Sequence, residues 1–514
     1  MPVITDRDRR WWILAVLGVA QLMIVVDISI VNIALPSAQR ALHITAADRQ
    51  WVITAYTLAF GGLLLLGGRV ADYMGRKRIL IVGLLGFAGA SAIGGLAPDA
   101  GMLFAARGLQ GAFAALMAPA GLSLLSVTFR EPHERARAFG VYGAIAGGGL
   151  AIGLIAGGLL TQYASWRWCL LVNAPIAVAA GLAAARIVPE SRNRGRTRYD
   201  LPGAVTSTLG MVALVYGLSE ASLHGWGAAT TVGLLLAAGV LLGVFLLVEA
   251  RIRNPLLPLR VVTDRNRGGS YLTMLLVGIG LMGTMLFLTF YMQLTLHYSP
   301  LKTGVSYLPF SAGIVVSATV ASKLIVRFRP RGVMAVGLLM AAAGMLWFAR
   351  LGVHSHYWAH IAPAEILMSL GMGLVFVPVS NTGLFRLRAG DSGVASATIN
   401  TSQQIGGSIG TALLNTIDVT ATTAYLHSHL PAGLGATAAA GGGAAAGATA
   451  RAAAAKAAAA ITAHALVHGY SVAFYVGAAV LGLSIVAVLA LIDAPASAAP
   501  DLVGAGEDAL PVAV

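Results

Sequence analysis

The chain has 514 residues, of which 57% are hydrophobic and 11% are charged, and its formal net charge at pH 7 is +14. A soluble protein carries about 25% charged residues, so this composition is too apolar to cover a surface that faces water and indicates a membrane protein. The one cysteine, Cys169, excludes an intrachain disulfide.

Fourteen apolar stretches are long enough to span a membrane, which takes roughly 20 residues. Lipid offers the backbone no hydrogen-bond partner, so each stretch is predicted to be a helix. The predicted fold class is therefore an all-α membrane protein with fourteen transmembrane helices. The predicted spans are 11–34, 51–70, 79–97, 103–126, 138–162, 168–188, 203–219, 229–248, 270–293, 303–322, 333–349, 362–383, 393–417 and 470–492.

Lysine and arginine alternate between the loops. With the N-terminus placed in the cytoplasm, the cytoplasmic segments hold 26 of the 34 lysine and arginine residues. Cytoplasmic loops of membrane proteins carry this excess. The pattern predicts a multi-pass protein of the cell (plasma or inner) membrane with both termini in the cytoplasm. It also explains the positive net charge, so nucleic acid is not expected as a partner.

Two segments near the C-terminus differ in composition from the spans. Residues 418–469 are predicted to form an external loop, in which the Ala-rich end of the low-complexity stretch 432–460 favours a helix. A fifteenth span is the alternative there, and Arg451 and Lys456 argue against it. The tail, 494–514, is polar and acidic and is predicted to be a disordered cytoplasmic segment.

The stretch GGRVADYMGRKRIL, residues 67–80, concentrates charge between two apolar spans. It resembles the loop signature G-x-x-x-D-x-x-G-R-[KR] of the major facilitator superfamily. The residues in register are Gly68, Asp72, Gly75, Arg76 and Lys77. The resemblance implies a cytoplasmic latch between two halves of a transporter. Asp72 would accept a hydrogen bond from a helix N-terminus or pair with an arginine, and Gly75 would allow a tight turn.

Further motifs resemble the same superfamily. RGLQGAF (107–113) is similar to its span-4 signature, and GGGLAIGLIAGGLL (147–160) is similar to the span-5 antiporter signature G-x-x-x-G-P-x-x-G-G, with Leu154 where proline is usual. The matching glycines are Gly149, Gly153, Gly157 and Gly158. VDISIVNIALP (26–36), SWRWCLLVNAPIAV (165–178) and ATINTSQQIGGSIGTALL (397–414) resemble the fourteen-span drug:proton antiporter branch.

This resemblance implies two pseudo-symmetric six-helix bundles plus two inserted helices. The predicted domains are a first bundle at 1–188, a linker with the inserted helices at 189–250, and a second bundle at 251–493. A faint repeat supports the duplication, because SKLIVRFRPRG (322–332) parallels the stretch 67–80 and keeps its basic residues. The protein is expected to act as a monomer.

Three ionisable residues lie within the predicted spans: Asp27, Arg107 and Glu365. Each costs about 2.5–3.5 kcal/mol at a helix centre, so such residues normally face a water-filled cavity or a partner. From the helical rise per residue, Asp27 and Arg107 lie at similar depths below the outer ends of their spans. We expect them to face one another across, or along, the central cavity, with Gln110 on the same helix face as Arg107.

These residues predict a coupling site. Asp27 is interpreted as a carboxylate that alternates between a proton and a cationic substrate, with Arg107 and Gln110 beside it. The alternative is a permanent ion pair that only fixes helix packing. Glu365 is interpreted first as a carboxylate that snorkels to the interface, and alternatively as a second titrating site or a substrate contact.

Other residues carry weaker predictions. Gly149, Gly153 and Gly157 recur every fourth residue and predict a face for close helix packing. A polar and aromatic substrate pocket has the candidate lining residues Phe287, Tyr291, Asn400 and Gln404. No metal site is predicted, because HSHYWAH (354–360) is interpreted as part of an interfacial aromatic belt.

The predicted function is a proton-coupled exporter, or antiporter, of amphipathic or cationic small molecules such as antibiotics and dyes. Its expected partners are the lipid bilayer, the small-molecule substrate and protons, and no cofactor is expected. The chain has no GxxxxGK[ST] motif and no paired carboxylates or nucleophile motif, so we do not expect an enzyme. The alternatives are a dedicated exporter of one endogenous metabolite and a receptor or scaffold that has lost transport.

Overall fold

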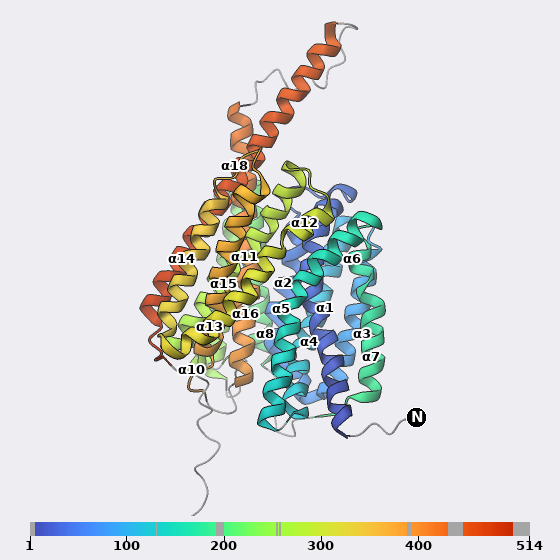
Figure 1. Ribbon diagram of the computed structural model, residues 1–514, viewed down its shortest axis with the longest axis vertical. Helices are drawn as coiled ribbons and strands as arrows, with labels where there is room; N and C mark the ends of the chain where they lie inside the picture. Colours follow the sequence, from blue (N-terminus) through green and yellow to red (C-terminus); the bar gives the residue numbers. More distant parts are fainter. Residues whose placement is uncertain are drawn as a thin grey trace, which may run out of the picture.

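The computed structural model describes residues 6–129, 131–191, 200–252, 255, 257, 259–387, 392–429 and 446–496. Within these residues the regular elements are helices, and they form one tall bundle (Figure 1). The elements are α1 (Asp6–Ala41), α2 (Trp51–Met74), α3 (Arg76–Gly95), α4 (Ala100–Thr128), α5 (Pro132–Tyr163), α6 (Trp168–Leu171), α7 (Asn173–Ile187), α8 (Leu201–His224), α9 (Ala229–Arg251), α10 (Leu259–Val262), α11 (Arg265–Phe290), the π-helical turn η1 (Tyr291–Thr295), α12 (Pro300–Ser306), α13 (Leu308–Arg327), α14 (Pro330–Phe348), the π-helical turn η2 (Tyr357–Ile361), α15 (Ala362–Gly383), α16 (Ser392–His429) and α18 (Ala446–Leu491).

Each of the fourteen predicted spans overlaps one of these helices. By length and hydropathy, 11 described helices qualify as membrane spans, or 12 if the bent pair within α2 is one span. The apolar part of α5 is short, Gly148–Tyr163, and α16 is rich in Thr, Ser, Asn and Gln. The all-helical membrane architecture is therefore confirmed, while the count of fourteen stays a prediction.

Local sequence signals begin several of the helices. Asp99 accepts a hydrogen bond from the backbone N–H of Met102 at 2.9 Å and caps α4. Asp264 caps α11 by accepting from the backbone N–H of Arg267 at 3.0 Å. Prolines occupy the first turns of α5, α8, α12, α13, α14 and α15, where the missing N–H costs nothing.

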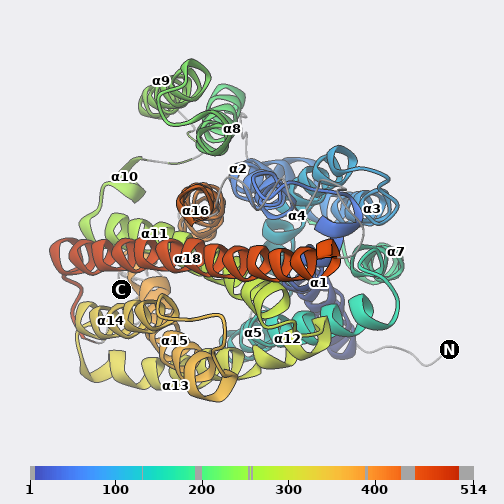
Figure 2. The ribbon, with the colours of Figure 1, turned by 90° about the horizontal axis from the view of Figure 1, so that it is seen from above.

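The helices pack as two groups with a pair beside them. Helices α1 to α7 contact one another, and helices α11 to α18 contact one another. Figure 2 shows α8 and α9 paired at one side, with α8 against α2 and α16. This arrangement resembles the predicted bundles with two inserted helices, and the domain boundaries at 188 and 250 stay predictions.

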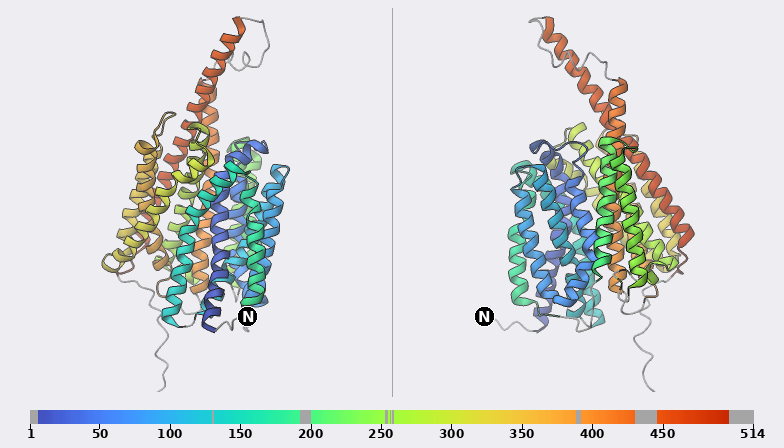
Figure 3. Two further views of the ribbon diagram at one scale, coloured as in Figure 1. Left: turned by 45° about the vertical axis from the view of Figure 1, so that its right-hand side comes forward. Right: turned by 180° about the vertical axis from the view of Figure 1, so that it is seen from behind.

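The bundle has two distinct ends. The start of α1 and the loop between α2 and α3 lie at one end, which we call the basic end, together with the last residue of α18. The start of α2 and the projecting part of α18 lie at the other, which we call the opposite end (Figures 1 and 3).

The segment 418–469, predicted to be an external loop with a helical stretch, is helical on both sides of residues 430–445. Helix α16 continues to His429, and α18 begins at Ala446 and runs unbroken to Leu491. Alanine has the highest helix propensity, and extending a helix that a span has already nucleated costs little. Residues 430–445 and most of the tail predicted to be disordered lie outside the described residues.

Candidate coupling site

The carboxylate of Asp27, on α1, lies inside the first group of helices and is fully buried. Its Oδ2 accepts a hydrogen bond from Arg107 Nη1 at 2.6 Å. Its Oδ1 accepts from Gln110 Nε2 at 3.1 Å and from Asn173 Nδ2 at 2.8 Å. All three of these contacts are with hydrogen-bond donors, and an acceptor-only carboxylate can use every one of them.

Four neighbours hold the guanidinium of Arg107 in place. Its Nε donates to the carbonyl oxygen of Val52 at 2.9 Å, and its Nη1 also donates to Gln110 Oε1 at 2.9 Å. Its Cζ lies 4.5 Å from the centre of the Tyr56 ring. Gln110 Nε2 in turn donates to Ser91 Oγ at 2.5 Å. The site is thus assembled from α1, α2, α3, α4 and α7, and we call it the Asp27 cluster.

A glycine lets two of these helices approach. A Cβ at Gly111 on α4 would collide with the carbonyl oxygen of Tyr56 on α2. This close approach brings the α2 backbone, including the Val52 carbonyl, within reach of Arg107. Gly111 therefore helps to position the guanidinium of Arg107, because it allows α2 and α4 to pack closely.

The predicted contact between Asp27 and Arg107 is present, but the predicted water-filled cavity around it is wrong for this structure. The two side chains are 0% and 1% exposed and lie within the first group of helices rather than between the two groups. They turn inward because Gln110 and Asn173 supply donors there. Water can therefore reach Asp27 only after the helices move.

The segment that resembles the superfamily loop signature is held mainly within the first group. Arg76 donates from Nε and Nη2 to Asp72 Oδ1 at 2.9 and 2.8 Å, which is one of the two pairings expected for Asp72. Gly75 joins α2 to α3 with φ of 109°, a conformation that favours glycine. A Cβ at Gly68 would lie 3.5 Å from Pro119 Cβ of α4, so this position has room for a side-chain atom.

Further contacts tie this loop to the end of α7 and beyond. Lys77 Nζ donates to the carbonyl oxygen of Ala185 at 2.7 Å, and the Lys77 backbone N–H donates to Glu190 Oε1 at 3.2 Å. Arg69 Nη2 reaches past the first group to the carbonyl oxygen of Pro255 at 3.0 Å. The role of the loop as a latch between two halves stays a prediction, and Glu190 is a partner that the sequence did not reveal.

The glycine stripe of α5 packs mainly on α1. A Cβ at Gly149 would lie 3.0 Å from Val25 Cγ1, and one at Gly157 would lie 2.9 Å from the Ile30 carbonyl oxygen. A Cβ at Gly153 would likewise lie 2.7 Å from Ser29 Cβ. Gly158 alone of the four faces the second group.

At Gly158 the two groups touch. A Cβ there would lie 2.7 Å from Leu301 Cα of α12. The backbone N–H of Leu301 also donates to Gln162 Oε1 at 3.3 Å. Helix α5 therefore contacts both its own group and the second one, and the expected role of these glycines in coupling stays a prediction.

The four candidate pocket residues do not share a pocket in the structure. Phe287 is fully buried against Tyr470 of α18, and the hydroxyl of Tyr291 donates to the carbonyl oxygen of Gly352 at 2.6 Å. Gln404 is buried against α2, whereas Asn400 is exposed. The side chains of Phe287 and Tyr291 fill the interior of the second group in this structure, and the substrate pocket stays a prediction.

Glu365 does not snorkel. It lies in the first turn of α15 and is fully buried, so the interfacial interpretation is wrong. Its Oε2 lies 3.3 Å from the hydroxyl oxygen of Tyr357, and its Oε1 has no hydrogen-bond partner among the residues that the structure describes. This face of α15 turns toward the protein interior with Met368 and Ser369.

A second buried ion pair, which the sequence did not reveal, joins the two groups at the opposite end. Arg49 Nη2 lies 2.5 Å from Asp418 Oδ2, and each side chain is 3% exposed. Arg49 Nε donates to Asn415 Oδ1 at 2.9 Å, and the guanidinium lies 4.2 Å from the centre of the Phe290 ring. The sequence does hold one sign of this pair, because Arg49 and Asp418 carry opposite charges at the same end of predicted spans 2 and 13.

Hydroxyl pairs extend this contact along α2 and α16. Thr54 Oγ1 lies 2.7 Å from Thr411 Oγ1, and Thr57 Oγ1 lies 2.7 Å from Ser408 Oγ. Thr54 and Thr57 are three residues apart on α2, as are Ser408 and Thr411 on α16, so each pair shares one face of its helix. We call this contact, from Arg49 with Asp418 through Thr57 with Ser408, the polar seam.

Comparison with known proteins assigns the family. The profile of the Major Facilitator Superfamily matches residues 17–411. The puromycin resistance protein pur8 of Streptomyces alboniger is 49% identical over 96% of this chain and 93% of its own length. The cephamycin export protein CmcT of Amycolatopsis lactamdurans is 40% identical over 80% of this chain and 86% of its own length.

More distant matches agree. The multidrug resistance protein Stp of Mycobacterium tuberculosis is 31% identical over 80% of this chain and 76% of its own length. The crystal structure of a bacterial homolog to the human lysosomal transporter Spinster, inward-facing and unoccupied, has a TM-score of 0.62 at 16% identity, covering 95% of this chain and 99% of that one. The chain therefore belongs to the Major Facilitator Superfamily of membrane transporters.

Proposed function

We propose that this small-molecule exporter exchanges protons for basic, amphipathic antibiotics and dyes, with Asp27 as a proton-binding residue. The superfamily match and the export and resistance proteins among its relatives make the chain a small-molecule exporter. Proton coupling and the choice of cargo are the proposal. The observation that carries it is a carboxyl group and a guanidinium in hydrogen-bond contact, fully buried together where five helices meet.

A buried ion pair contributes little net stability to a fold. The desolvation of two charges often exceeds their attraction, and apolar residues of similar volume are frequently as stable or more stable. Protonation of Asp27 removes one of the two charges, and Arg107 then keeps its contacts with Val52, Gln110 and the Tyr56 ring. The link from α1 to α4 weakens, and this favours a different arrangement of the helices.

The distribution of basic residues gives the direction of transport. Cytoplasmic loops are rich in lysine and arginine, so the basic end is assigned to the cytoplasm and the opposite end to the outside of the plasma membrane. A membrane potential of 100 mV supplies about 2.3 kcal/mol for each inward-moving charge. Protons and cargo are the ligands of the proposed cycle, one chain is its working unit, and it uses no cofactor.

The cargo class is inferred from the relatives and from charge. Puromycin carries a primary amine that is protonated at neutral pH, and the 49% identical relative is a puromycin resistance protein. Puromycin is therefore the first cargo to test. A dedicated exporter of one compound is the second candidate, because the puromycin, cephamycin and lincomycin relatives are each named for a single antibiotic.

The test is cargo uptake into inverted membrane vesicles. We expect an imposed pH gradient, acidic inside, to drive puromycin uptake by the wild type. Uptake by Asp27→Asn should fall at least about tenfold, the change produced by about 1.4 kcal/mol in the coupled step.

The control is Asp493→Asn, which removes an exposed carboxylate at the basic end that lies 3.6 Å from Arg329. The Asp493→Asn variant should take up puromycin at the wild-type rate. Normal, pH-driven uptake by Asp27→Asn would refute the assignment of Asp27, and a wild type that ignores the pH gradient would refute proton coupling. A panel with tetracenomycin C, lincomycin and a cationic dye separates broad from dedicated export.

A further inference from the structure

The buried carboxyl of Glu365 differs from that of Asp27 in having no positively charged partner. Among the described residues no ion pair includes it. The titratable groups that act on it are two tyrosines, Tyr357 of η2 and Tyr307 between α12 and α13. An isolated carboxylate in a dry interior is very costly unless it is neutral.

The hydrogen bonds of Tyr357 show where the proton lies. Its hydroxyl oxygen is 2.6 Å from the carbonyl oxygen of Ser306 and 3.3 Å from Glu365 Oε2. A tyrosine hydroxyl has one proton, and a carbonyl oxygen only accepts, so the closer contact takes that proton. The contact with Glu365 is then a hydrogen bond only if the carboxyl group is the donor.

The other tyrosine cannot serve Glu365 as a donor. The hydroxyl of Tyr307 donates to the carbonyl oxygen of Met285 at 3.0 Å and lies 2.9 Å from Thr289 Oγ1. The Oε1 atom of Glu365 is buried without a partner. A carboxylate would leave several lone pairs unsatisfied here, whereas a carboxylic acid uses its proton on Tyr357.

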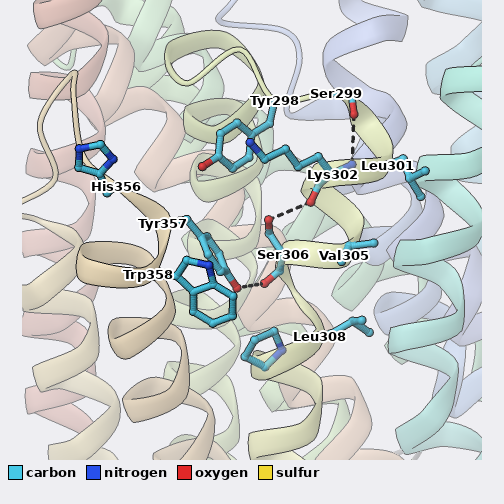
Figure 4. Close-up of a pocket in the computed structure, with 11 residues that line it drawn as sticks. Tyr298, Ser299, Leu301, Lys302, Val305, Ser306, Leu308, His356, Tyr357 and Trp358 are labelled. Carbon is cyan, nitrogen blue, oxygen red and sulfur yellow. Dashed lines mark hydrogen bonds between the residues drawn. The ribbon is translucent and has the colours of Figure 1, made fainter.

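A cavity at the opposite end adjoins Tyr357, the hydrogen-bond partner of Glu365. It has a volume of about 770 Å³, and Tyr357 forms part of its wall together with Tyr298, Lys302, Ser306 and Trp358. Figure 4 shows the hydroxyl of Tyr357 directed at Ser306 across this wall. The ammonium of Lys302 lies 3.6 Å from the centre of the Tyr298 ring. It therefore makes a cation–π contact with Tyr298 rather than an ion pair with Glu365.

We propose that Glu365 is a second proton-binding site, loaded from the medium at the opposite end through this cavity and the hydroxyl of Tyr357. A hydronium ion in the cavity gives a proton to the Tyr357 oxygen, and Tyr357 passes the proton that it held to the carboxylate. One water molecule and one neutral carboxylic acid result, and Tyr357 ends unchanged. Asp27 is buried in this conformation while Glu365 holds its proton.

This inference rests on the proposed proton antiport and adds a second proton to its cycle. The first test is infrared spectroscopy of the wild type in membranes at neutral pH. The wild type minus Glu365→Gln difference should contain the C=O band of a protonated carboxyl group. The same band should persist in Asp27→Asn, and its absence from the wild type would overturn the proposal.

The second test counts protons per cargo molecule. In proteoliposomes with the membrane potential clamped at zero, each coupled proton multiplies the puromycin ratio tenfold per pH unit. Glu365→Gln should therefore lower the ratio reached at one pH unit about tenfold relative to the wild type, since a tenfold ratio corresponds to about 1.4 kcal/mol. An unchanged ratio in a folded Glu365→Gln protein would overturn the second proton site.

Matched variants keep the two proposals distinguishable. Tyr357→Phe should slow proton loading and shift the pH profile of transport, whereas Tyr163→Phe, which removes the hydroxyl of an exposed tyrosine on α5, should not. Equal profiles for these two variants would overturn the relay. A wild type without proton-driven puromycin flux would refute the proposed function, whereas a wild-type ratio in Glu365→Gln would refute only the second site.

Discussion

At the scale of single residues, two buried carboxyl groups have opposite surroundings. Asp27 is ringed by the donors Arg107, Gln110 and Asn173. Glu365 faces one hydroxyl that is already committed to a carbonyl oxygen. Three donors can satisfy a carboxylate at Asp27, whereas the carboxyl of Glu365 has no comparable set of donors among the described residues.

We expect Arg107→Met to destabilise the protein strongly. The substitution removes the cation and leaves Asp27 buried without it, which costs about 3–5 kcal/mol. The double variant Asp27→Asn with Arg107→Met leaves no charge in the Asp27 cluster and should recover most of that loss. Thermal unfolding in detergent, followed by tryptophan fluorescence, measures both.

Additive effects of the two substitutions on the free energy of unfolding would contradict this account. If the double variant is as unstable as the sum of its single changes, the pair contributes no coupling energy. Gln110 and Asn173 would then hold α1 in place without the charge.

The sequence predicted the ion pair but not its full set of partners. Helical rise placed Asp27 and Arg107 at matching depths, and a charge within an apolar span is easily seen. Asn173 and Ser91 are uncharged and are flanked by small residues. The sequence around them therefore does not show that their side chains face Asp27 and Gln110. The inward turn of Asp27 depends on those donors, and this is why the predicted cavity was wrong.

At the scale of elements, the polar seam joins α2 to α16 where the groups meet. The sequence did not predict it, because Arg49 and Asp418 fall at span edges and were counted with the loops. Their contact depends on α16 continuing as a helix past residue 417. The register between two helices from different bundles is a tertiary property that no local pattern encodes.

We expect Asp418→Asn to open the opposite end. The variant removes the charge that Arg49 pairs with, and a loss of about 1.4 kcal/mol raises the open fraction about tenfold. The measurement is labelling of Thr54→Cys by a membrane-impermeant thiol reagent, in a Cys169→Ser background. Labelling should be faster when Asp418→Asn is also present.

The control is Glu134→Gln, which removes a partly exposed ion pair with Arg10 at the basic end. Partly exposed pairs contribute about 0–1 kcal/mol, so labelling of Thr54→Cys should not change. Equal labelling rates with and without Asp418→Asn would show that the ion pair does not hold the seam closed.

At the scale of the whole molecule, the contacts between the two groups concentrate at the opposite end. They include the polar seam, the approach of α5 to α12, and a hydrogen bond from Gln293 Nε2 to the carbonyl oxygen of Ile33 at 2.9 Å. The structure is therefore closed at that end. Composition and span length predicted the all-helical membrane fold, but they did not indicate this conformational state or the projection of α18.

The central claim is that cargo and protons exchange, and the most direct measurement is proton movement driven by cargo alone. Proteoliposomes that contain wild-type protein and a pH-sensitive dye are given a puromycin gradient with no initial pH gradient. The account predicts that the internal pH changes as protons move against the puromycin flux, and that Asp27→Asn abolishes this change. Puromycin flux in the wild type without any change in internal pH would contradict it.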